Sequence, residues 1–137
     1  MAYPPSKGVQ VSADRTAHRL AVLLAVSGTT HFATPRPYDM IVPRSLPGGP
    51  RLWTYVSGAA ELATAAALAS PRTRKWGGLA AAGLFAAVFP ANVKMARDWR
   101  DKPAPLRTLA WARLPLQAPL IWSALTVARE TPATEPH

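Results

Sequence analysis

Four apolar runs divide the chain, and polar or proline-rich segments separate them. The runs cover residues 17–34, 52–70, 76–94 and 107–128. Each is close to the roughly 20 residues that an α-helix needs to cross a hydrocarbon core of about 30 Å. The pattern therefore predicts an all-α integral membrane four-helix bundle. The flanking residues 1–16 and 129–137 are polar, which predicts a disordered leader and a disordered tail.

Prolines shape one connection and two of the expected helices. Residues 35–51 hold five prolines and two glycines, which exclude a long regular element. The apolar side chains of this segment predict an interfacial stretch that lies on the bilayer edge or dips into it. Pro90 predicts a kink near the end of the third helix. Pro115 and Pro119 predict a bent or locally broken fourth helix.

Charge is distributed in the same way as hydropathy. The chain has 16 Lys and Arg residues, a net charge of +9 and a pI near 11.1, and the basic residues flank the apolar runs. This is the usual pattern beside membrane spans, and it suits an anionic lipid surface. No basic helix interleaves with aromatic residues, so we expect no nucleic-acid partner. The basic turn at residues 71–75 and the uncleaved leader place both termini in the cytoplasm, in a cell or inner membrane.

The chain contains no cysteine. Thiolate catalysis, disulfide exchange, iron–sulfur clusters and cysteine-ligated zinc are therefore excluded within it. No Walker loop, GxSxG, HExxH or EF-hand pattern is present, so the sequence predicts no catalytic residues and no metal site. The chain therefore carries no self-contained catalytic motif, and whether it takes part in an enzyme stays open at this stage.

Glu61 is the one acid inside the second apolar run, and small residues surround it. Ser57, Gly58, Glu61 and Ala65 recur at three- or four-residue spacing, so they share one helical face. Small residues let neighbouring helices approach closely. We assign helix packing to one set of residues: Ser57, Gly58, Gly77, Gly78 and Pro90.

The strongly polar residues inside the runs fall in one half of the expected bundle, nearest the 35–51 connection. They are His31, Glu61, Asn92, Arg113 and Gln117. The simplest interpretation is a shared polar cavity for ligand binding or proton handling. Glu61 and Arg113 are the expected ion pair, because an unpaired buried charge is costly. His31 is a candidate hydrogen-bond partner, proton carrier or ligand, or a structural residue.

Three short pieces of the sequence resemble small DoxX-like membrane proteins. They are His31-Phe32 with Pro35, Pro37-Tyr38, Ile41-Val42-Pro43 and Leu46-Pro47; Ser57-Gly58 with Glu61-Leu62; and Phe89-Pro90-Ala91-Asn92 with Met95-Ala96. The resemblance covers residues 17–128. It implies a four-helix membrane domain associated with quinones or membrane redox complexes. Quinone is accordingly the one cofactor candidate, and the site residues keep the roles given above.

Two functions remain open at this stage. The first is a small subunit of a membrane redox complex that binds a quinone in the polar cavity. The second is a non-catalytic assembly or scaffold protein whose polar core only fixes helix packing. A small transporter and a soluble, alanine-rich bundle are weaker alternatives. The expected partners are the lipid bilayer, subunits of a membrane redox complex and further copies of the chain.

Overall fold

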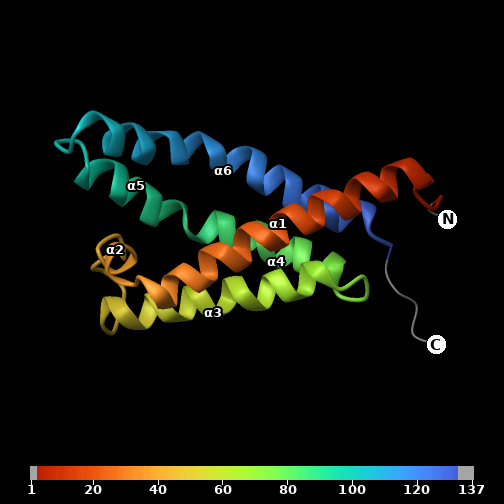
Figure 1. Cartoon of the computed structure of the whole chain (residues 1–137), viewed down its shortest axis with the longest axis horizontal. Coiled ribbons are helices and arrows are strands. Elements are labelled where there is room, and N and C mark those ends of the chain that lie inside the picture. The colour runs from red at the N-terminus through yellow and green to blue at the C-terminus, as the bar shows by residue number, and fades with distance from the viewer. Residues whose placement is uncertain (1–2, 133–137) are drawn as a thin grey trace.

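The computed structural model describes residues 3–132, and within this range every regular element is a helix (Figure 1). The helices are α1 (Lys7–Ala33), α2 (Arg36–Asp39), α3 (Pro50–Ala69), α4 (Arg74–Ala87), α5 (Phe89–Asp98) and α6 (Ala104–Glu130). The expected all-α class is confirmed. α1, α3, the α4–α5 pair and α6 correspond to the four apolar runs.

α1 begins ten residues before its apolar run. The Ser6 hydroxyl accepts a hydrogen bond from the Val9 amide at 3.4 Å and caps the helix. Residues 7–16 are therefore helical, and their assignment to a disordered leader was wrong. The polar composition misled because Ala13 is buried and Asp14 forms an ion pair with Arg74 at 2.6 Å. Residues 1–2 and 133–137, from the predicted leader and tail, lie outside the described range.

The proline-rich segment forms the single turn of α2 followed by a loop. Gly48 has a φ of 82°, a left-handed conformation that glycine adopts without steric cost, and it leads into α3. Pro50 occupies the first turn of α3, where its missing N–H costs nothing. This agrees with the expectation that no long element forms here.

The prolines act differently in the two later helices. α4 ends at Ala87 and α5 begins at Phe89, so the chain breaks where Pro90 cannot donate to the preceding turn. α6, in contrast, continues through both Pro115 and Pro119. Of the bent or locally broken helix expected there, the break does not occur. Both prolines lie on one exposed row of α6 with Trp111, at four-residue spacing. Lost hydrogen bonds on an outward face are accommodated by gentle curvature.

The helices pack in pairs, α1 against α3 and α4 against α6, with α3 joining α4 (Figure 1). Glycine allows three of these approaches. A Cβ at Gly58 would lie 2.7 Å from the His31 Cβ, one at Gly77 2.7 Å from the Leu68 nitrogen, and one at Gly78 2.8 Å from the Ala124 oxygen. Ser57 is half-buried beside Gly58 on α3.

Two apolar clusters lie at different levels of the molecule. The larger cluster joins α1, α3, α4 and α6 around residues such as Leu24, Leu68 and Phe85. The smaller cluster joins α5 to α6 through Met95, Ala96 and Ala110, and Ile41 packs against it. At this level α5 and the first half of α6 diverge from α1 and α3, as Figure 1 shows. Ile41 therefore connects the two diverging arms.

One helical stretch in the described chain, Arg74–Asp98, is long and apolar enough to cross a membrane. A buried helix of a soluble protein meets the same criteria, so this stretch is a weak indication of membrane association. It does not establish the multi-pass arrangement expected from the sequence. The other long helices are rich in alanine and carry Glu61, Arg113 or a polar first turn, which lowers their mean hydropathy.

Candidate functional site

The sequence-predicted polar residues lie between the two apolar clusters. On α6, Arg113 and Gln117 lie between Ala110 of the smaller cluster and Ala124 of the larger one. On α5, Asn92 lies between Phe85 and Met95 along the chain, and His31 and Glu61 lie one or two turns beyond the larger cluster on α1 and α3. We call His31, Glu61, Asn92, Arg113 and Gln117 the polar layer.

His31 and Glu61 form an ion pair that joins α1 to α3. His31 Nδ1 lies 3.1 Å from Glu61 Oε2, and the Ser27 hydroxyl donates to Glu61 Oε1 at 3.2 Å. All three side chains can meet because Ser27 and His31 are four residues apart on one face of α1. Both members of the pair are largely buried, with exposed fractions of 7% and 8%.

His31 also forms a hydrogen bond within α1. Nδ1 also lies 2.7 Å from the Ser27 carbonyl oxygen, which can only accept, so Nδ1 carries a proton and donates to it. That proton is directed along α1 rather than at Glu61. As a result Glu61 Oε2 is buried without a hydrogen-bond partner, although it lies close to the ring.

Tyr38 covers His31 from the α2 side. The two rings stack with centroids 3.7 Å apart and an interplanar angle of 19°. The Tyr38 hydroxyl lies 2.6 Å from the Thr30 hydroxyl, which holds the ring in place. Tyr38 was not among the predicted site residues. Its signal in the sequence was an aromatic residue in a proline-rich connection directly after the helix that carries His31.

Asp39 anchors α2 to the start of α3. Its carboxylate accepts hydrogen bonds from the Thr54 hydroxyl at 2.6 Å and from Arg51 Nε at 2.8 Å. Desolvation by itself raises the pKa of Asp39. The two hydrogen bonds and the charge of Arg51 outweigh it, so the pKa lies below its ordinary value of 3.8. This anchor holds Tyr38 over His31.

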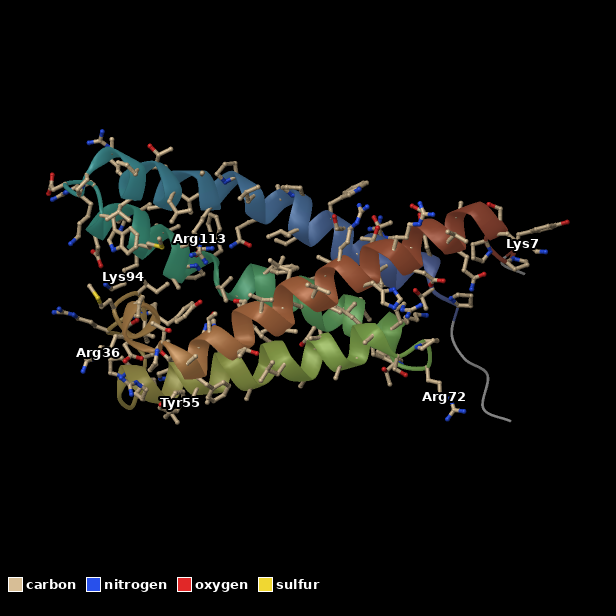
Figure 2. The ribbon with its side chains drawn as sticks, in the orientation of Figure 1. Lys7, Arg36, Tyr55, Arg72, Lys94 and Arg113 are labelled. Atoms are coloured by element: carbon tan, nitrogen blue, oxygen red, sulfur yellow. The ribbon has the colours of Figure 1, made fainter. Side chains whose placement is uncertain are left out.

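The expected ion pair between Glu61 and Arg113 does not form. Glu61 is paired with His31, and Arg113 is half-buried on α6, where it extends toward the space between the two arms (Figure 2). The reason is that α6 diverges from α3 at this level. Arg113 still acts on the Glu61 carboxylate through space. Residue spacing predicts how deep each charge lies along its helix, but not how far apart the helices are at that depth.

Asn92 and Gln117 complete the polar layer. Asn92 is 2% exposed, and Gln117 is 7% exposed with its Oε1 atom buried and without a hydrogen-bond partner. A buried, unpaired acceptor costs about 1–3 kcal/mol. The layer therefore contains two acceptor atoms that receive no hydrogen bond, together with the cation of Arg113. They are Gln117 Oε1 and Glu61 Oε2, of which the second lies in the ion pair with His31. Within residues 3–132, no group of three side chains is suited to hold a metal ion.

The fold and site define an all-helical protein with a buried polar layer between two apolar clusters. The chain belongs to the family described as "Domain of unknown function (DUF8561)", whose model matches residues 20–128. No curated protein and no solved structure matches the chain.

This family assignment overturns the DoxX resemblance. The motifs that carried the resemblance are short and answer local physical demands. Gly58 is required by the close approach of α1, and Pro90 marks the break between α4 and α5. Closely packed helices in unrelated proteins meet the same demands, so such motifs do not identify a family.

Proposed function

We propose that this chain is a small four-helix integral membrane protein whose polar layer binds an amphipathic molecule bearing hydrogen-bond donors. The distribution of side-chain size supports the membrane location. The core consists largely of alanines, while large apolar side chains point outward on every long helix. Examples are Val22 (64% exposed), Val56 (49%), Leu79 (44%) and Trp122 (67%). Small residues inside and large apolar residues outside are typical of helices packed in lipid.

The charges support the same location. Basic and acidic residues gather at the two ends of the molecule, as Figure 2 shows for Lys7 and Arg72 at one end and Arg36 and Lys94 at the other. Between residues 20 and 35, 52 and 70, 76 and 93, and 108 and 128, the only Asp, Glu, Lys or Arg residues are Glu61 and Arg113. A band with so few charges suits a hydrocarbon core.

The single observation that carries the binding proposal is the buried Gln117 Oε1 atom, which has no hydrogen-bond partner. Glu61 Oε2 accepts no hydrogen bond either and has only the His31 ring beside it, and water is scarce in a bilayer core. A ligand with hydroxyl groups on an apolar body supplies donors without losing its membrane solubility. A quinol has this chemistry. Since the chain has no cysteine, it supplies no iron–sulfur cluster or redox-active thiol to react with such a ligand.

A scaffold function has its own supporting observation. Ser27 and His31 hold Glu61 across the same helix pair in which Gly28 and Gly58 bring the backbones together. A Cβ at Gly28 would lie 2.9 Å from the Gly58 oxygen. In this alternative the polar layer fixes the register of α1 on α3 and binds no ligand.

Mass spectrometry of the full chain purified from membranes in mild detergent distinguishes the two. The parent is compared with Glu61→Gln and Gln117→Leu, and Glu130→Gln serves as the matched control at the far end of α6. We expect a bound quinol or quinone in the parent and the control, and at least a tenfold loss in both polar-layer variants.

If the parent and all variants carry no such molecule and retain the same partner proteins, the binding function is wrong. A lowered unfolding temperature in Glu61→Gln alone would then establish the scaffold function. Recovery of the chain in the supernatant after membrane sedimentation would contradict the membrane location itself.

A further inference from the structure

A recess lies outside the polar layer, between α5 and the loop that precedes α3. It has a volume of about 630 Å³ and is open on one side. Its lining consists of Pro43, Arg44, Phe89, Pro90, Val93, Lys94, Arg97 and Asp98. We call it the basic hollow. The proposed ligand of the polar layer does not account for it, because none of the polar-layer residues lines it.

The α5 wall of the hollow changes from apolar to charged along the helix. Phe89, Val93 and Arg97 form one row at four-residue spacing, and Pro90, Lys94 and Asp98 form the adjacent row. From Phe89 to Arg97 the rise is about 12 Å, at 1.5 Å per residue. The apolar part lies toward the middle of the chain's long helices and the charged part toward the loop end. An amphipathic ligand would enter with its polar group at that end.

The cations of the hollow are not equivalent. Lys94 is engaged: its Nζ donates to the Met40 carbonyl oxygen at 3.1 Å and pairs with Asp98. The bond to Met40 attaches α5 to the residue that follows α2, and Figure 2 shows Lys94 at this end of the molecule. Arg44 and Arg97 are exposed, and their guanidinium groups make no ion pair or hydrogen bond within residues 3–132. Two free guanidinium groups on opposite walls suit a phosphate, which accepts several hydrogen bonds at once.

We propose that the basic hollow binds the phosphate-bearing headgroup of an anionic phospholipid. The inference rests on the proposed membrane location. Three cationic side chains against one carboxylate favour an anion, and Phe89, Pro90 and Val93 offer a surface to the glycerol and the first acyl carbons. The bound lipid would sit where α5 and the 40–44 segment meet, and would hold the two diverging arms together.

The test is lipid binding to the full chain in mild detergent, followed by native mass spectrometry during titration with phosphatidylglycerol. The variant is Arg44→Gln with Arg97→Gln. The matched control is Arg36→Gln with Arg107→Gln, which removes two exposed charges from the same end of the molecule but outside the hollow. We expect binding about thirtyfold weaker in the hollow variant than in the control, since each of the two basic side chains contributes on the order of 1 kcal/mol to anionic-lipid binding.

Two further arms identify the ligand. Phosphatidylcholine should bind far more weakly than phosphatidylglycerol, and millimolar inorganic phosphate should displace little of the bound phosphatidylglycerol. Equal binding of both lipids, or equal loss in the two variants, would overturn the proposal. Strong competition by inorganic phosphate would assign the hollow to a soluble phosphate compound instead. Membrane sedimentation of each protein separates failure of the hollow from failure of the membrane location.

Discussion

At the scale of single residues, the close approach of α1 to Gly58 predicts that a larger residue at this position destabilises the protein. Gly58→Ala places a Cβ 2.7 Å from the His31 Cβ and 2.9 Å from Phe32, so α1 and α3 must separate. We expect a loss of about 1–3 kcal/mol in the free energy of unfolding, because overpacking of rigid neighbours forces backbone shifts. Thermal unfolding in detergent, followed by circular dichroism, measures it.

Gly83→Ala is the matched control for this substitution. Gly83 is also inside a helix, but a Cβ there meets nothing within 4 Å. Alanine is favoured over glycine in a helix interior by about 1 kcal/mol. We therefore expect Gly83→Ala to be neutral or stabilising. A similar loss of stability in both variants would show that close packing at Gly58 is unimportant.

The Asp39 anchor predicts a dependence of stability on pH. Its pKa in the folded protein is lowered below 3.8 by Thr54 and Arg51, which outweigh desolvation. A lowered pKa means that the anchor contributes stability above pH 3.8 and loses it as the pH falls through the folded pKa. Asp39→Asn should therefore unfold at a lower temperature than the parent at pH 7. The difference should shrink as the pH falls below 3.8 and vanish below the folded pKa of Asp39. A constant difference at every pH would contradict the anchor.

The sequence predicted the members of the polar layer better than their partners. The positions of His31 and Glu61 along their helices follow from residue spacing, which is set by helix geometry. The pairing of Glu61 with His31 rather than Arg113 depends on which helices adjoin at that level, and spacing along one helix carries no such information. Tyr38 was missed for the same reason, since its ring reaches His31 through the turn of α2.

At the scale of elements, Arg74 joins three helices and was interpreted only as part of a basic turn. The side chain is 5% exposed. Its Nε donates to the Leu68 carbonyl oxygen at 2.9 Å, and NH2 donates to the Ala69 carbonyl oxygen at 3.2 Å. NH1 donates to Asp14 at 2.6 Å. Arg74 thus satisfies the free carbonyls at the end of α3 and attaches the first turns of α1.

Arg74→Ala should therefore destabilise the protein by about 2 kcal/mol or more, because buried carbonyls lose charged donors. Lys75→Ala is the matched control, since Lys75 adjoins Arg74 and makes no hydrogen bond or ion pair in the described chain. Arg74→Ala should also increase hydrogen exchange of the amides in residues 7–16, because Asp14, which helps to hold this segment, loses its partner. Unchanged exchange in that segment would show that α1 is ordered without this contact.

The local sequence predicts some helix ends correctly and others incorrectly. Pro90 ends α4 as expected, because its lost hydrogen bond falls where the chain changes direction. Pro115 and Pro119 carry the same local signal, yet α6 continues through them. Pro115 and Pro119 differ from Pro90 because both lie on the outward face of α6. Which face of α6 points outward depends on its orientation in the whole fold. The first turns of α1 were missed in the same way, since Ala13 and Asp14 are stabilised by packing and by Arg74.

At the scale of the whole molecule, the membrane location can be tested because the chain contains no cysteine. Single cysteines can therefore be introduced without background. Val22 and Trp122 are 64% and 67% exposed, but they lie in the apolar band, by which we mean residues 20–35, 52–70, 76–93 and 108–128. Arg15 and Arg100 lie outside this band, toward opposite ends of the molecule. A maleimide that cannot cross membranes reacts with a hydrated thiolate, which hydrocarbon does not support.

In intact membranes Val22→Cys and Trp122→Cys should remain unlabelled until detergent denaturation. Arg100→Cys should label from outside, and Arg15→Cys only after permeabilisation if the termini are cytoplasmic. After permeabilisation, labelling of Val22→Cys as fast as Arg15→Cys would mean that water reaches Val22, and the bundle would then not be embedded in lipid.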